Sequence, residues 1–425
     1  MSEYTHTING KSVTSPTTLD VQNPATQKKV AEVPVATKEQ LDEAVAAARA
    51  ALPAWSAKSE DERAQVLEAI AGVIEKNIGE YKQILTSEQG KTLTNAEWEL
   101  GGAVLWLRET AKLRLPEKVI IDNEQTRITE RRVPIGVAPP GVLNAISGDD
   151  GLGPWITTHP GIDKVSFTGS SETGKKVMAS ASTGLKRLTL ELGGNDPAII
   201  LPDVDVAKAV PDLFWAALVN NGQTCAAAKR LYVHEKIYDQ FREELVKFAK
   251  SVKTGDGTDP ESQLGPVQNI LQYKKVLTFF DDVKSNGYKF ITGGDVDPNP
   301  TGGLFIPASF VDNPPEDSKI VREEPFGPIV PLLKWSDEAD VIKRANNTNL
   351  GLSASVWGKD LGAVERIARQ IQAGTVCMNE LNPATPFSAF GGHKESGVGV
   401  ENGLNGLLAY SNIQSFTLKK QAAFA

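Results

Sequence analysis

The sequence predicts an α/β fold whose main sheet is largely parallel. From about residue 160 onward, short apolar runs that suit β-strands alternate with helical patterns. We expect strands at 164–168, 187–192 and 231–234, and helices that begin at Ser171, Val204 and Lys236. Such alternation is typical of parallel sheets, because a chain that returns to pair in parallel crosses over through a helix. Hydrophobic residues form 40% of the 425 residues and charged residues 23%, an ordinary composition for a globular protein.

The segments outside this region add local signals. Roughly the first 35 residues predict short strands and turns. Two helices should then begin at capping boxes, Thr37 with Gln40 and Ser59 with Glu62. The run from 119 to 133 alternates in polarity and predicts a charged strand in an exposed or edge position, and 408–419 predicts a final strand.

Charge and cysteine content exclude several classes of protein. The net charge of −8, from 45 basic and 53 acidic residues, gives no reason to expect a nucleic acid or an anionic membrane as partner. No stretch approaches the ~20 apolar residues of a membrane-spanning helix, and the first residues lack the pattern of a secretory signal. Only Cys225 and Cys377 occur, which indicates a reducing compartment, and the four histidines are scattered without metal-ligand spacing. We therefore expect a cytoplasmic protein without a metal site.

Cys225 is a candidate nucleophile. It follows a predicted helix and a turn signal, Asn220-Asn221-Gly222. A thiol near a short helix start would have a lowered pKa and would act as a nucleophile, whereas the simpler interpretation is a small buried apolar residue. The other cysteine, Cys377, lies in an apolar run that predicts a strand, so we expect it in the core.

Glu191 is a candidate general base. By strand alternation Leu190 and Leu192 face one side of the strand while Thr189 and Glu191 face the other. A carboxylate on an interior strand, followed by two glycines, suits proton transfer. The alternative is a solvated glutamate at a strand edge.

The segment from Phe167 to Lys175 follows a strand and opens a helix. Its small residues would let backbone amides and the helix N-terminus approach a phosphate. It also nearly matches a nucleotide-binding P-loop, but Lys176 stands where that motif needs a Ser or Thr for Mg²⁺. A P-loop NTPase is therefore a distant alternative.

Five segments, in this order, resemble the aldehyde dehydrogenase superfamily. They are Phe-Thr-Gly-Ser at 167–170, Glu-Leu-Gly-Gly-Asn at 191–195, Gly-Gln-Thr-Cys at 222–225, Glu-Pro-Phe-Gly-Pro at 324–328 and Phe-Gly-Gly-His-Lys-Glu-Ser-Gly at 390–397. The 34-residue spacing from Glu191 to Cys225 is also that of the family, and Asn-Pro-Ala-Thr at 23–26 fits as well. The resemblance covers nearly the whole chain.

The resemblance implies a nicotinamide-dependent oxidation of an aldehyde to a carboxylic acid. Cys225 would attack the aldehyde carbon, and Glu191 would activate the water that hydrolyses the resulting thioester. The cofactor would be NAD or NADP. Its implied contacts are Thr168, Gly169, Ser170, Leu192, Gly193, Glu324 and Phe326, with Gly169 and Ser170 at the pyrophosphate and Glu324 at the nicotinamide ribose.

The resemblance also implies three parts. These are a Rossmann-type cofactor domain (1–118 and 138–193), an α/β catalytic domain (194–394) and oligomerisation strands (119–137 and 407–425). The partners expected are a small-molecule aldehyde and further copies of the chain, as a homodimer or homotetramer. A small or medium aliphatic aldehyde or a semialdehyde is the default substrate, and residues 379–389 are expected at the entrance to the site.

The chain departs from the family at Val137. In family members the strand that corresponds to 134–137 continues into Pro-Trp-Asn and a further strand and helix, whereas here Val137 joins Ala138 directly. Roughly 45–50 residues, about one and a half βαβ units, are absent, so the cofactor domain is expected to be incomplete by two βα units. The lost Asn is an oxyanion donor, a group typically worth ~10²–10³ in rate. A Lys for the adenosine ribose is lost with it. A catalytically silent relative that acts through subunit association is therefore the alternative function.

Overall fold

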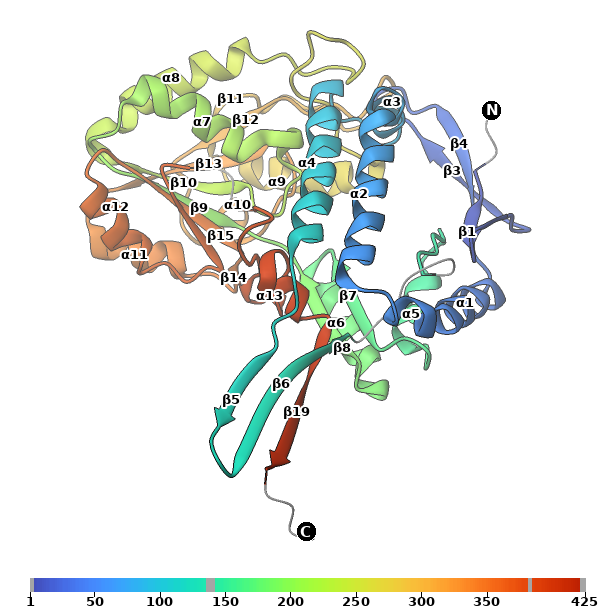
Figure 1. Ribbon diagram of the computed structural model, residues 1–425. Coiled ribbons are helices and arrows are strands. Elements are labelled where there is room, and N and C mark those ends of the chain that lie inside the picture. Colours follow the sequence, from blue (N-terminus) through green and yellow to red (C-terminus); the bar gives the residue numbers. More distant parts are fainter. Residues whose placement is uncertain (1–3, 135–141, 381–383, 421–425) are drawn as a thin grey trace.

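The computed structural model describes residues 4–134, 142–380 and 384–420, and its largest element is a seven-stranded sheet (Figure 1). In spatial order the strands are β11 (Lys289–Thr292), β12 (Ser309–Asp312), β13 (Ile329–Trp335), β10 (Ala228–His234), β9 (Asp196–Ile200), β15 (Ser353–Trp357) and β16 (Thr375–Met378). Every neighbouring pair is parallel except β11 with β12. The predicted α/β fold with a largely parallel sheet is thus confirmed.

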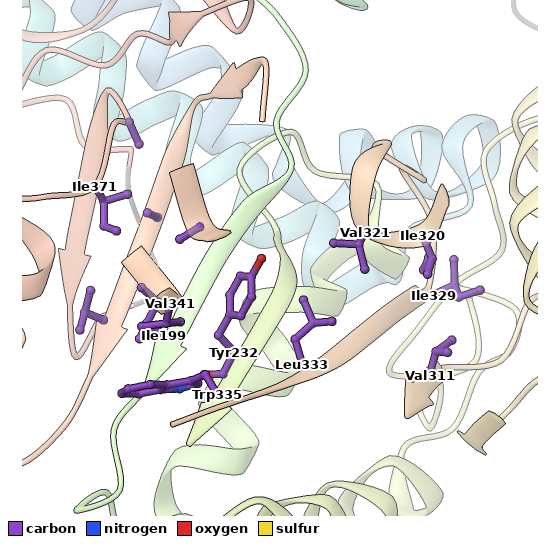
Figure 2. Packing of buried hydrophobic residues seen from close by; sticks show 14 of the residues in the cluster. Ile199, Tyr232, Val311, Ile320, Val321, Ile329, Leu333, Trp335, Val341 and Ile371 are labelled. Atoms are coloured by element: carbon purple, nitrogen blue, oxygen red, sulfur yellow. The ribbon is translucent and has the colours of Figure 1, made fainter. Parts of the chain in front are cut away.

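Both faces of this sheet are buried, and β9 shows how its sequence achieves it. Ala198 and Ile200 pack on one side against α7 (Val206–Leu218) and α8 (Tyr238–Ser251). Ile199 and Leu201 pack on the other side, in a cluster that includes α9 (Ile270–Ser285), α11 (Glu338–Asn346) and α12 (Leu361–Ala368). Figure 2 shows part of this second cluster. Burial on both faces explains why the strands read as nearly continuous apolar runs.

A second, smaller sheet carries the strand–helix–strand unit predicted at 164–192. β7 (Lys164–Thr168) pairs in parallel with β8 (Arg187–Glu191), and the short β18 (Gly397–Val398) pairs with β8 in the opposite direction. Between the two parallel strands runs α6 (Ser171–Ala181), which begins at the predicted residue and follows α5 (Leu152–Thr158) along the chain. The buried core of this strand–helix–strand unit is small and consists of Val165, Val177, Leu190 and Leu192. Thr168 is paired with Glu191, so both strands end at the same edge.

The N-terminal segment forms two short hairpins and four helices. The hairpins are β1 (His6–Ile8) with β2 (Lys11–Val13) and β3 (Thr18–Gln22) with β4 (Lys29–Pro34), and the helices are α1 (Lys38–Ser56), α2 (Glu60–Lys76), α3 (Ile78–Gln89) and α4 (Leu93–Lys112). Both predicted capping boxes are confirmed. The amide of Gln40 donates to Thr37 Oγ1 at 3.3 Å, and the amide of Glu62 donates to Ser59 Oγ at 3.2 Å.

A three-stranded arm projects from the body (Figure 1). It consists of β5 (Lys118–Asp122), β6 (Thr126–Pro134) and β19 (Ser411–Lys419), paired antiparallel in the order β19-β6-β5. The strand-like run predicted over 119–133 is in strand conformation, but a turn divides it into β5 and β6. The carbonyl of the Asn123 side chain accepts hydrogen bonds from the amides of Gln125 and Thr126, and this local turn reverses the chain into a hairpin.

The remaining elements are short, and several boundaries differ from the predictions by a few residues. They are β14 (Leu350–Gly351), β17 (His393–Lys394), α10 (Lys319–Arg322) and α13 (Gly403–Leu408). The final strand begins at Ser411 rather than at 408, because α13 occupies the preceding residues. The junction between Val137 and Ala138 lies outside the described residues, as do residues 421–425 of the expected C-terminal strand. None of the helices in the described ranges is long and apolar enough to cross a membrane.

Candidate active site

The carboxyl group of Glu191 is buried at the end of β8. The residue is 5% exposed, and neither carboxylate oxygen has a hydrogen-bond partner within the described part of the chain. Leu190 and Leu192 pack in the small core, as the strand alternation predicts, while Glu191 faces away from it. Burial, together with the nearby charge of Glu401, raises the pKa of Glu191 to about 8. The alternative of a solvated strand-edge glutamate is wrong.

The turn that follows Glu191 joins two distant sequence motifs to it. The Leu192 amide donates to the carbonyl of Ser396 at 2.9 Å, and Ser396 Oγ donates to the carbonyl of Gly193 at 2.6 Å. The Gly194 amide donates to Glu324 Oε1 at 3.0 Å. The 390–397 and 324–328 motifs, each of which reads as a loop by itself, therefore meet at the Gly193–Gly194 turn.

Both glycines of this turn are needed for space. A Cβ atom on Gly194 would collide with the backbone carbonyl of Cys225, and one on Gly193 would lie 2.5 Å from Glu324 Oε2. Cys225 and Glu324 thus both approach the turn closely. Glu191, Gly193, Cys225 and Glu324, which the sequence places up to 133 residues apart, are gathered in one region.

Cys225 sits on a sharply bent loop after α7. A short 3₁₀ turn over 219–222 precedes it, in which Asn220, Asn221 and Gly222 all have positive φ, at 52°, 57° and 70°. Gln223 anchors the loop, since its Nε2 donates to the carbonyls of Asn220 (3.0 Å) and Pro266 (3.3 Å). The loop leads directly into β10, so no helix starts at the cysteine.

The prediction of a lowered pKa for Cys225 is wrong. Burial, followed by the charges of Asp196 and Glu324, raises the pKa of the half-buried thiol to about 11. The main physical reason is burial, and the charge of Glu191 adds to the smaller effects of the other two carboxyl groups. At neutral pH the group is a thiol and needs a base to become a nucleophile.

The residues predicted to hold a pyrophosphate lie at the junction of β7 and α6. Thr168 ends the strand, and the amide of Gly169 donates to the carbonyl of Glu191 at 3.1 Å. Ser170 is the N-cap of α6, and its hydroxyl accepts from the amide of Thr173 at 3.2 Å. The N-terminal turn of α6 is therefore positioned next to the end of β8, an arrangement that suits an anion.

Phe326 lies in the loop that carries Glu324. Its φ of 47° is in the left-handed region, and Gln272 on α9 holds it through hydrogen bonds from Nε2 to the carbonyls of Pro325 and Phe326, each 3.0 Å. Phe326 also lines a cavity of about 290 Å³ together with Asn220 and Gln223, which lie on the cysteine loop. The loop of Glu324 and the loop of Cys225 are therefore neighbours.

Four charged residues at this site were missed by the sequence analysis. Asp196 is buried beside Gly194, accepts a hydrogen bond from the Ser353 hydroxyl, and burial raises its pKa to about 8. Lys229 and Arg230 follow Ala228 at the start of β10, and each is 1% exposed. Glu401 accepts a hydrogen bond from Ser166 Oγ at 2.9 Å. Charged residues at the start of a strand have the composition of an exposed loop, so no local feature of the sequence predicts that they are buried.

The sequence matches known proteins over nearly its whole length. The pattern of the aldehyde dehydrogenase family matches residues 11–138 and 138–416, two stretches that meet at residue 138. A probable aldehyde dehydrogenase of Pseudomonas sp is 37% identical over 475 aligned positions, covering 99% of this chain and 96% of the relative. That alignment is longer than the 425 residues of this chain, so positions of the relative have no counterpart here.

Solved structures agree in fold. An Escherichia coli NADP-dependent enzyme has a TM-score of 0.94 at 30% identity and covers 98% of both chains. Betaine aldehyde dehydrogenase of Staphylococcus aureus, in complex with NAD⁺, has a TM-score of 0.94 at 27% identity and covers 99% of this chain and 96% of that chain. By sequence pattern, identity and fold, the chain belongs to the aldehyde dehydrogenase family.

Proposed function

We propose that the protein oxidises an aldehyde to its carboxylic acid by covalent catalysis on Cys225, with NAD⁺ or NADP⁺ as the hydride acceptor. The observation that carries this proposal is the buried carboxyl of Glu191, whose two oxygens have no partner in the described part of the chain and whose charge acts on the Cys225 thiol. A buried carboxyl that bonds to nothing in the protein is available for proton transfer. The same feature favours a working enzyme over the non-catalytic alternative.

The first step forms a bond between sulfur and carbon. Ionised Glu191 takes the proton of the Cys225 thiol, directly or through water, and the sulfur attacks the aldehyde carbon to give a tetrahedral thiohemiacetal. A carboxylate with a pKa of about 8 is a stronger base than an ordinary glutamate, which offsets part of the cost of ionising a thiol with a pKa of about 11. The oxygen of this adduct carries the negative charge, so loss of hydride from the same carbon leaves a thioester on Cys225. Glu191 then gives its proton to solvent and is ionised again.

The residues present fit the nicotinamide end of a dinucleotide. The Gly193–Gly194 turn allows close approach, Glu324 can accept ribose hydroxyls, and the start of α6 at Ser170 can bind the pyrophosphate. When bound there, NAD⁺ or NADP⁺ supplies the site that accepts the hydride.

The last step releases the acid. Glu191 removes a proton from a water molecule, the oxygen attacks the thioester carbon, and the carbon–sulfur bond breaks so that Cys225 leaves as thiolate. The net reaction consumes an aldehyde, water and oxidised cofactor, and it yields a carboxylic acid, reduced cofactor and a proton. We expect a small or medium aliphatic aldehyde or a semialdehyde as substrate.

Cys225→Ala tests the nucleophile. The variant should abolish formation of reduced cofactor from aldehyde, because no other group forms the thioester. Cys377→Ala is the matched control, since it removes the other free cysteine. This variant should keep the wild-type rate within about twofold, because the Cys377 side chain takes no part in the proposed reaction. Unchanged turnover in Cys225→Ala would remove Cys225 from the mechanism.

We further infer three parts and an oligomer. The cofactor domain comprises 1–118 and 138–193, the catalytic domain 194–394, and the arm of β5, β6 and β19 joins copies of the chain into a dimer or tetramer. Exposed apolar residues on this arm, among them Ile413, Phe416 and Leu418, support association. The two free cysteines suit a reducing compartment, and we infer the cytoplasm.

A further inference from the structure

Lys229 is a buried charged residue to which the proposed reaction assigns no role. It lies on β10, in the interior of the seven-stranded sheet, and is 1% exposed. Its Nζ donates to the carbonyl of Gly327 at 3.0 Å and to the carbonyl of Ala217 at 3.2 Å. Among the described residues it forms no salt bridge, so its hydrogen bonds go to backbone alone.

One of the two carbonyls lies in the Glu324 loop, and the other lies at the end of the helix that leads into the Cys225 loop. Ala217 is in the last turn of α7, immediately before the bent segment that leads to Cys225. Gly327 follows Glu324 by three residues in the loop that meets the Gly193–Gly194 turn. Packing at this point is close, because a Cβ on Gly222 would lie 2.5 Å from both the Gly327 carbonyl oxygen and Lys229 Nζ.

We propose that Lys229 is a positioning residue, which ties the Glu324 loop to the Cys225 loop and so holds the nicotinamide ribose at a fixed distance from the nucleophile. The proposal rests on the proposed function, in which Glu324 binds that ribose. Other hydrogen bonds that hold this loop come from the Gln272 side chain to the carbonyls of Pro325 and Phe326, from the Gly194 amide to Glu324, and from the Ser309 amide to the carbonyl of Pro328. Lys229 adds a bond to the carbonyl of Gly327.

A lysine amine suits this position for two reasons. The C-terminal turn of a helix favours a cation, and Ala217 lies in that turn of α7. Burial lowers the pKa of Lys229 to about 7, against the opposing effect of the Glu324 and Asp196 charges. A neutral amine still carries two N–H groups and an ammonium three, so both forms can donate to both carbonyls. The tether therefore does not depend on the protonation state of the lysine.

The test compares Lys229→Met with Lys186→Met. Lys186 is a matched control, because its Nζ also donates to two backbone carbonyls, those of His159 and Ile162, but it precedes β8 at the end opposite Glu191. Dissociation constants for NAD⁺ and NADP⁺ and the KM for the aldehyde are measured on the full chain. Lys229→Met should weaken cofactor binding at least tenfold with the aldehyde KM within twofold, and Lys186→Met should change neither by more than twofold.

A dissociation constant within twofold of wild type in folded Lys229→Met would overturn the proposal. If the methionine variant does not fold, Lys229→Gln replaces it. Glutamine keeps N–H donors but is one bond shorter, so we expect a loss of at least threefold, and a change below twofold would overturn the proposal.

Failure of the proposed function is distinguishable, since wild-type protein would then bind neither NAD⁺ nor NADP⁺. In that case amide hydrogen exchange of the apo protein decides. Faster exchange over 323–329 in Lys229→Met, but not in Lys186→Met, supports the tether, and equal exchange overturns it.

Discussion

The carboxyl of Glu191 has its pKa raised to about 8, and this value sets an expectation for the pH dependence of the reaction. The base acts in its ionised form, so kcat/KM should rise with pH and level off above about 8. Glu191→Gln should lower activity by about 10²–10⁴-fold and remove this limb of the profile. Measurement of kcat/KM across pH tests it, and an unchanged profile in Glu191→Gln would assign the limb to another group.

Glu401→Gln provides a matched control for that profile. Its charge is a cause of the raised pKa of Glu191. Removal of the charge should therefore shift the limb toward lower pH without abolishing turnover. A limb that stays in place would show that burial alone sets the pKa.

Asp196 links the site to stability. Its folded-state pKa of about 8 lies above the ordinary value of 3.8, so its stabilising contribution is fully present below the unfolded pKa and is lost as pH rises through about 8. Asp196→Asn keeps an acceptor for the Ser353 hydroxyl but cannot ionise. Its melting temperature relative to wild type should rise between about pH 5 and about pH 9. The same difference in melting temperature between Asp196→Asn and wild type at both pH values would contradict a buried, protonated carboxyl.

Among the elements, the arm of β5, β6 and β19 makes a prediction of its own. Nine register pairs join β19 to β6, whereas its apolar side chains are largely exposed. A chain that ends at Tyr410 lacks β19 and should elute as a monomer, because the surface proposed to join copies is removed. A chain that ends at Lys420 is the control and should keep the wild-type mass. Light scattering measures both, and equal masses would exclude the arm as the interface.

Two elements show how far local sequence predicts structure. The unit of β7, α6 and β8 has the predicted bounds to within one residue, because its strand alternation and its Ser170 cap are local signals. β10 was predicted from Leu231 but begins at Ala228. Its first three residues include Lys229 and Arg230. Their charges would predict an exposed position from sequence, because the backbone carbonyls that accept their hydrogen bonds lie far away in the chain.

At the scale of the whole molecule, the size of the sheet that contains β7 and β8 determines how tightly we expect the cofactor to bind. The described residues supply two parallel strands to it, β7 and β8. In the proposed function the nicotinamide end of a dinucleotide has its partners, whereas the strands that the family resemblance implies beneath the adenosine half belong to the segment expected to be absent after Val137. The two stretches that match the family meet at residue 138. We therefore expect this chain to bind NAD⁺ or NADP⁺ more weakly than a version with the family segment restored after Val137.

Thermal shift measures this difference. A ligand that binds only the folded state stabilises it by RT ln(1 + [L]/Kd), about 2.7 kcal/mol at a hundredfold excess over Kd. Both chains should show a cooperative melt with a cofactor-dependent rise, larger for the restored chain at equal ligand concentration. Equal shifts would mean that the adenosine half needs no further strands.

The sequence by itself determined the α/β class, the family, the capped helices and the motifs that meet at the site. These follow from local periodicity and from motifs in which glycine is required for close approach. The sequence did not reveal Asp196, Lys229, Arg230 or Glu401 as members of that site. Only the tertiary structure decided the electrostatics: the raised pKa values of Cys225 and Glu191, the buried Asp196 and the tether at Lys229. The physical reason is that burial and electric field are set by groups far away in the chain. The Lys229 amine, for example, bonds to a carbonyl 98 residues distant in sequence.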